Sequence, residues 1–150
     1  MNRGRLLGID HGIKRIGLAV SDFSWLVARE LAVIKRQSKA EDFARIGHII
    51  AEQKVAAIIV GLPTNYEAAP GTHTQADTVR LWVQRLQEFT PLPVVLWDEQ
   101  LSSEDAKALA RQQRRKPTQA IDDLAARVIL QSYLDALRDN LAAPPPIAEG

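Results

Sequence analysis

The stretch LLGIDHGIKRIGLAVSD, residues 6–22, decides how the rest of the chain is arranged. A short apolar run ends in the carboxylate of Asp10, Gly12 marks a tight turn, and a second apolar run extends from Ile16 to Val20. Two runs of strand length on either side of a turn signal predict a β-hairpin. Because strand side chains alternate between faces, Gly8 shares a face with Asp10, and we expect it to leave open space beside the carboxylate.

The position of Asp10 at the end of the first apolar run requires a physical explanation. A carboxylate in a core-facing strand is costly unless a cation meets it. We therefore interpret Asp10 as a metal-binding carboxylate. The chain must then supply further ligands from elsewhere.

Composition bounds the class of protein. With 150 residues, 46% of them hydrophobic, the chain fits one domain over residues 1–140, followed by a tail, 141–150, that is expected to be disordered. The absence of cysteine excludes a disulfide framework and a thiolate zinc site, and it suits a reducing cytoplasm. No signal-peptide pattern and no apolar run long enough to span a bilayer are present, so we expect no membrane association.

The remaining segments alternate between strand and helix patterns. A third strand completes a meander with the hairpin, and later strands are separated by amphipathic helices, so we predict a single α/β unit in the order βββαβαβαα. Its predicted segments are strands near 28–34, 55–61 and 94–97, helices near 38–53, 74–89, 102–117 and 118–140, and a loop over 62–71.

Three acids occupy places where an acid is structurally awkward. Asp10 and Glu99 end strands, and Asp122 lies one turn into the final helix. Clustered carboxylates suit hard cations such as Mg²⁺ or Mn²⁺, whereas zinc is unsuited to a chain with three scattered histidines, His11, His48 and His73. Each acid also has a simpler explanation, because the helix macrodipole stabilises Asp122 and Glu99 could be a solvated strand end.

Basic side chains lie in two places. Lys14 and Arg15 flank the hairpin turn, and a second group precedes Pro117; it consists of Arg111, Arg114, Arg115 and Lys116. We interpret both groups as contacts to nucleic-acid phosphates, which would give affinity that is independent of sequence and weakens with salt. The alternative for the second group is a set of cations that stabilises a helix C-terminus.

Four segments together resemble a known family. They are GIDHGIKRIGLAVSD at 8–22, VGLPTNYEAAPG at 60–71, WDEQLSSEDA at 97–106 and AIDDLAARVILQSYLD at 120–135. In this order they look like the signature blocks of the YqgF (RuvX) family, which is related to the RuvC resolvases within the ribonuclease H-like superfamily. The resemblance covers nearly the whole chain.

The resemblance implies a fold and an activity. It implies a ribonuclease H-like, five-stranded mixed sheet in the order 3-2-1-4-5 flanked by helices, and a metal-dependent nuclease whose catalytic acids are Asp10, Glu99 and Asp122. The family is described as maturing the 5′ end of the 16S rRNA precursor, with a Holliday junction resolvase as the alternative. Two positions depart from the pattern: Gln100 stands where the family commonly has Arg, and Ala125 where the resolvases have a fourth acid.

The mechanism expected from these residues is phosphodiester hydrolysis. Asp10 would bridge one or two Mg²⁺ or Mn²⁺ ions held also by Glu99 and Asp122, so that a bound water becomes the nucleophile. The expected partners are nucleic acid, RNA in preference to DNA, and ribosomal precursor particles, with the chain acting as a monomer or homodimer. One rival is an RNA-binding assembly factor that does not cleave. Another, a phosphotransferase of the actin and sugar-kinase type, would need a second phosphate loop, which this chain lacks.

Overall fold

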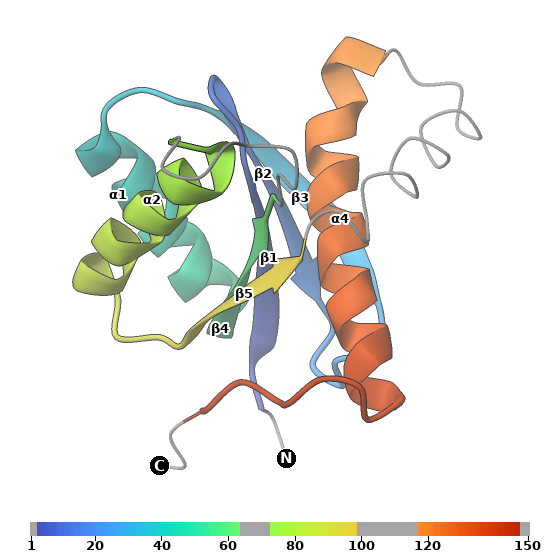
Figure 1. Ribbon diagram of the computed structural model, residues 1–150. Coiled ribbons are helices and arrows are strands. Elements are labelled where there is room, and N and C mark those ends of the chain that lie inside the picture. Colours follow the sequence, from blue (N-terminus) through green and yellow to red (C-terminus); the bar gives the residue numbers. More distant parts are fainter. Residues whose placement is uncertain (1–2, 64–72, 99–116, 148–150) are drawn as a thin grey trace.

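A central mixed sheet with helices on both faces forms the protein (Figure 1). The computed structural model describes residues 3–63, 73–98 and 117–147, and for residues 117–123 it describes the backbone alone. The strands are β1 (Arg5–His11), β2 (Arg15–Ser21), β3 (Ala28–Lys35), β4 (Val55–Leu62) and β5 (Val94–Asp98). The helices are α1 (Lys39–Gln53), α2 (Gln75–Phe89) and α4 (Pro117–Arg138).

The strand order is β3-β2-β1-β4-β5, as the family resemblance implies. β1 pairs with β2 and β2 with β3 in antiparallel fashion, whereas β1–β4 and β4–β5 are parallel. The carboxyl ends of β1, β4 and β5 therefore meet at one edge of the sheet, where α/β proteins commonly place their sites.

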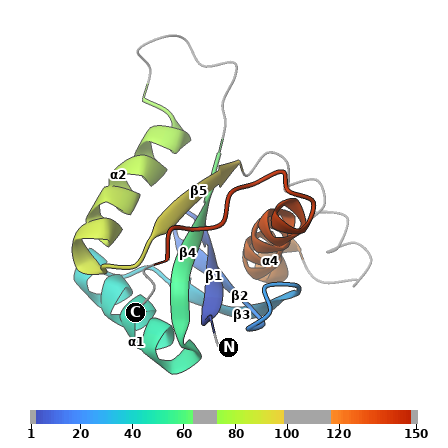
Figure 2. The same ribbon diagram turned by 90° about the horizontal axis from the view of Figure 1, so that it is seen from below.

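Helices α1 and α2 cover one face of the sheet and α4 covers the other (Figure 2). Alternation along β1 divides its side chains between two cores: Leu7 and Ile9 pack in the core under α1 and α2, and Leu6 packs in the core under α4. Asp10 therefore belongs to the α4 face.

Local sequence signals explain where the helices begin. The Ser38 side chain accepts a hydrogen bond from the backbone N–H of Glu41 and caps α1, and Thr74 forms a reciprocal capping box with Asp77 at the start of α2. Pro117 was expected to end a preceding helix. Pro117 opens α4, where its missing N–H costs nothing, and the predicted helix before it lies outside the described residues.

The segment that follows α4 packs against the rest of the protein. The Tyr133 hydroxyl donates a hydrogen bond to the Ala143 carbonyl (2.7 Å), and Ile147 packs against the α4-side core. The structure thus gives residues 141–147 partners that the sequence pattern did not indicate. None of the described helices is long and apolar enough to cross a membrane.

Candidate active site at the carboxyl edge of the sheet

Asp10 lies at the carboxyl edge of the parallel strands. It is the penultimate residue of β1 and is half-buried, opposite Gly17 of β2. On its other side β1 is paired with β4 through Ile9 and Val60, and β4 is paired with β5 through Leu62 and Asp98. Three strand ends thus lie side by side with the candidate catalytic acid among them.

Gly8 has a different role from the one expected from the sequence. A Cβ atom at Gly8 would lie 2.7 Å from the Leu130 Cβ and 3.1 Å from the Ala126 carbonyl oxygen. The position is therefore filled by α4 and provides no open space beside Asp10. The glycine is needed because the helix backbone approaches the strand closely.

The close approach of α4 sets the position of the third predicted acid. Helix α4 runs antiparallel to β1, so its N-terminal end lies toward the carboxyl end of the strand (Figure 1). From Ala126 back to residue 122 is one helical turn, roughly 6 Å. From Gly8 to Asp10 is roughly 7 Å along β1. The backbone of Asp122 therefore lies toward the level of Asp10.

The contacts of β5 indicate which of its faces adjoins this site. The indole N–H of Trp97 donates to the Ser132 hydroxyl of α4 (3.1 Å), and its ring makes an edge contact with Tyr133. Val95 packs in the same core. Residues 95 and 97 therefore share the face of Asp10.

Part of the predicted site lies outside the described residues. This applies to Glu99, to the side chain of Asp122 and to the basic group, which comprises Arg111, Arg114, Arg115 and Lys116. Within the part of the chain that is described, no three His, Asp or Glu side chains gather at one point. The three-carboxylate metal site therefore stays a prediction.

The cations of the hairpin are available to a ligand. Lys14 and Arg15 are exposed, and neither side chain makes a hydrogen bond or ion pair with any other described residue. Arg15 pairs with Lys35 of β3, and both share the face of Asp10 by strand alternation. Lys35 was missed by the sequence analysis, although the Lys35–Arg36 pair that closes an apolar strand is a readable signal.

His11 is buried next to the candidate catalytic acid in the sequence. It is the last residue of β1, it is buried, and its ring lies 4.7 Å from that of Trp82. Burial and the nearby Arg36 lower the pKa of His11 to about 4, against smaller opposing effects of its own backbone and Asp42. His11 is therefore neutral at neutral pH and cannot serve as a cation for phosphate.

Comparisons with known proteins agree with this architecture. A family model described as "RuvX: Holliday junction resolvase" matches residues 4–136. A protein of Thermoanaerobacter pseudethanolicus named "Putative pre-16S rRNA nuclease" is 42% identical over 140 residues, covering 91% of this chain and 99% of the relative. A protein of the same name from Symbiobacterium thermophilum is 40% identical, covering 95% and 96%.

Solved structures share the fold at low sequence identity. T. thermophilus RuvC in complex with a Holliday junction substrate superposes with a TM-score of 0.59 at 21% identity, covering 95% of this chain and 99% of that one. The Fowlpox virus resolvase bound to Holliday junction DNA gives 0.53 at 12% identity, covering 89% and 98%. At these identities the likeness establishes the fold alone.

Proposed function

Because the chain belongs to the RuvX family, we propose that it is a metal-dependent nuclease that hydrolyses phosphodiester bonds, with the 5′ end of the 16S rRNA precursor as its substrate. The single observation that carries the proposal is the placement of Asp10. A half-buried carboxylate lies at the carboxyl edge of three parallel strands, on the face covered by the helix that bears Asp122.

The donor set fits a hard divalent cation. Asp10, Glu99 and Asp122 would hold Mg²⁺ or Mn²⁺ through carboxylate oxygens. When bound, such an ion supplies activation of a water molecule and stabilisation of charge on the phosphodiester oxygens. A strand carries Asp10 and a helix carries Asp122, and such regular elements hold side chains in a fixed arrangement.

The basic residues of the same edge would bind the backbone of the substrate. Arg15 and Lys35 are exposed on the face of Asp10, Lys14 is exposed in the hairpin turn, and all three would contact phosphates. Arg127 takes no part, because its guanidinium pairs with Glu30 at 3.0 Å. The group at residues 111–116 would add affinity that does not depend on sequence.

Cleavage assays test the proposal directly. The chain is incubated with an RNA that spans the 5′ end of the 16S rRNA precursor, an unrelated structured RNA and a four-way DNA junction, each with Mg²⁺, Mn²⁺ or chelator. We expect metal-dependent cleavage of the precursor RNA, and a loss of about a hundredfold or more in Asp10→Asn at unchanged melting temperature.

A matched carboxylate controls for charge. Asp139 is exposed near the C-terminal end of α4 and pairs with Arg138, so Asp139→Asn should cleave as the unmodified chain does. Full activity of Asp10→Asn would contradict the proposal. Preferential cleavage of the DNA junction would support the resolvase named by the family description, and binding without cleavage under every metal would support an assembly factor.

A further inference from the structure

The turn between β1 and β2 carries a largely exposed aliphatic side chain. Ile13 is 78% exposed, next to the exposed cations Lys14 and Arg15. β-Branched residues favour strands over turns. A single exposed isoleucine is nevertheless ordinary on a protein surface, so its meaning depends on how the turn is held.

Arg36, the residue that follows β3, holds this turn. Its guanidinium Nη1 donates to the carbonyl oxygens of Gly12 (3.0 Å) and Ile13 (3.2 Å), and its backbone N–H donates to the Lys14 carbonyl (2.9 Å). Three residues, Gly12 to Lys14, connect β1 to β2, and none of them is among the described residues with a positive φ angle, which short hairpin connections usually contain. The turn therefore lacks the usual hairpin geometry, and the guanidinium holds its carbonyls instead.

A buried carboxylate anchors Arg36 in turn. Asp42, in the first turn of α1, is 1% exposed and accepts a hydrogen bond from the Gln37 backbone N–H (2.9 Å). Its second carboxylate oxygen accepts no hydrogen bond from a described residue and lies 4.0 Å from the Arg36 Nε, so the two charges interact without a direct hydrogen bond. Because a buried charge is costly unless it is paired, this arrangement indicates a built support for the turn.

Glycine is also required at the base of the turn. A Cβ atom at Gly12 would lie 2.6 Å from the Arg15 carbonyl oxygen, which accepts the Gly12 N–H at 2.9 Å. The turn is thus narrow at its base and fixed at its carbonyls. Ile13 is presented on a rigid support.

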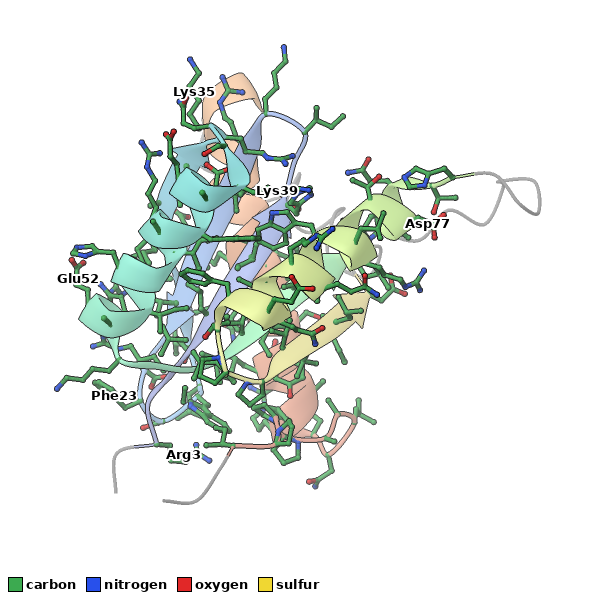
Figure 3. All side chains as sticks on the ribbon, turned by 90° about the vertical axis from the view of Figure 1, so that its left-hand side faces the viewer. Arg3, Phe23, Lys35, Lys39, Glu52 and Asp77 are labelled. Atoms are coloured by element: carbon green, nitrogen blue, oxygen red, sulfur yellow. The ribbon has the colours of Figure 1, made fainter. Side chains whose placement is uncertain are left out.

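The surroundings of the turn carry concentrated positive charge. Arg15 and Lys35 lie directly opposite each other, although like charges in that position destabilise a sheet. Lys35 and Lys39 lie at one end of the molecule, whereas Arg3 and Phe23 lie at the opposite end (Figure 3). A polyanion bound at the hairpin end would compensate the repulsion.

We propose that this turn is a preformed wedge, in which Ile13 packs against an unstacked base of the bound nucleic acid and Arg36 positions it. Lys14, Arg15 and Lys35 contact the flanking phosphates. The inference rests on the proposed nuclease function, because Ile13 follows Asp10 by only a few residues. A base packed against Ile13 would therefore lie near the candidate active site. The inference also names the substrate class: a boundary between paired and unpaired nucleotides, where unstacking a base costs least.

Binding measured without cleavage tests the wedge. The probe is a short RNA hairpin with a single-stranded 5′ extension and 2-aminopurine at the boundary, in the presence of chelator. The unmodified chain should raise 2-aminopurine fluorescence as the base unstacks. Ile13→Ser should abolish that rise and weaken binding about tenfold, whereas Ile13→Leu should retain both.

Leu141 provides a matched control. It is also 78% exposed and lies beyond the C-terminal end of α4, away from the hairpin, so Leu141→Ser should bind as the unmodified chain does. If Ile13→Ser binds like Leu141→Ser, or if the unmodified chain gives no fluorescence rise, the wedge is wrong.

A double-mutant cycle tests the role of Arg36. Arg36→Lys keeps the charge but loses the guanidinium that reaches two carbonyls, so it should weaken binding as Ile13→Ser does. The double variant should be no weaker than either single variant, because both act through one contact. If the binding losses of the two single variants multiply in the double variant, or if Arg36→Lys binds fully, Arg36 contacts a phosphate directly. Either result would overturn the positioning role. Equal melting temperatures establish that every variant is folded.

The two proposals can fail separately. Normal cleavage by Asp10→Asn together with lost binding by Ile13→Ser would remove the nuclease site and leave the wedge. Normal binding by Ile13→Ser together with lost cleavage by Asp10→Asn would rule out the wedge and support the nuclease site.

Discussion

A glycine two residues before Asp10 determines how closely the last helix approaches the sheet. Helix α4 meets β1 at Gly8 with its Ala126 carbonyl and Leu130 side chain. Every residue toward the N-terminal end of α4 is positioned by this contact, Asp122 among them. The geometry of the candidate site therefore depends on a residue that has no side chain.

Replacing Gly8 with alanine should lower stability and cleavage but leave RNA binding unchanged. In Gly8→Ala the new Cβ would overlap Leu130, so α4 must shift, and we expect a loss of about 1–3 kcal/mol in the free energy of unfolding. Cleavage should fall further, because Asp122 moves relative to Asp10, whereas RNA binding in chelator should be retained. Urea denaturation and the two assays above measure these effects.

Gly47 of α1 is the matched glycine. A Cβ there would meet only the end of the Phe89 ring, at 3.0 Å, on the opposite face of the sheet. Since alanine is favoured over glycine inside a helix, Gly47→Ala should be neutral or stabilising and fully active. A Gly8→Ala variant that matches it in stability and cleavage would contradict the role assigned to Gly8.

At the scale of elements, most of the fold could be predicted because its signals are local. Apolar alternation predicts the strands, and Ser38 and Thr74 mark the starts of α1 and α2. Where the described helices and strands differ from the prediction, they differ at boundaries: β4 extends to Leu62, β5 extends to Asp98, and α4 begins at Pro117. These ends are set by hydrogen bonding to neighbouring strands and by packing, which a single segment does not encode.

The connection between β2 and β3 depends on one carboxylate. Asp22 accepts hydrogen bonds from the backbone N–H groups of Leu26 (2.8 Å) and Val27 (3.2 Å). Slight burial pushes the pKa of Asp22 upward, but these backbone bonds outweigh it and lower the pKa below the ordinary 3.8. The charged form is therefore favoured by folding.

Asp22→Ala should lower the free energy of unfolding by roughly 0.5–1 kcal/mol at neutral pH, a modest loss because the side chain is exposed. A lowered pKa in the folded state gives stability that is present above the ordinary pKa of 3.8 and is lost as the pH falls through the folded value. The difference between the two proteins should therefore shrink in acid. Denaturation curves across this range measure it, and a difference independent of pH would refute the assignment.

At the scale of the whole molecule, the sequence could not predict contacts between distant segments. The face of β5 that adjoins Asp10 follows from the packing of Trp97 on α4. The burial of His11 against Trp82 joins β1 to α2, and the support of the hairpin turn by Arg36 and Asp42 joins it to α1. Each of these contacts joins elements that are distant in the sequence, and the periodicity of a single segment does not predict it.

The proposed reaction requires that Asp10, Glu99 and Asp122 jointly hold one cation. Titration of Mn²⁺ followed by electron paramagnetic resonance tests it most directly, on the unmodified chain, the single variants Asp10→Asn, Glu99→Gln and Asp122→Asn, and the control Asp139→Asn. We expect each of the three variants to weaken Mn²⁺ binding by at least about tenfold while the control binds normally. Unchanged Mn²⁺ affinity in any one of the three would contradict a shared site.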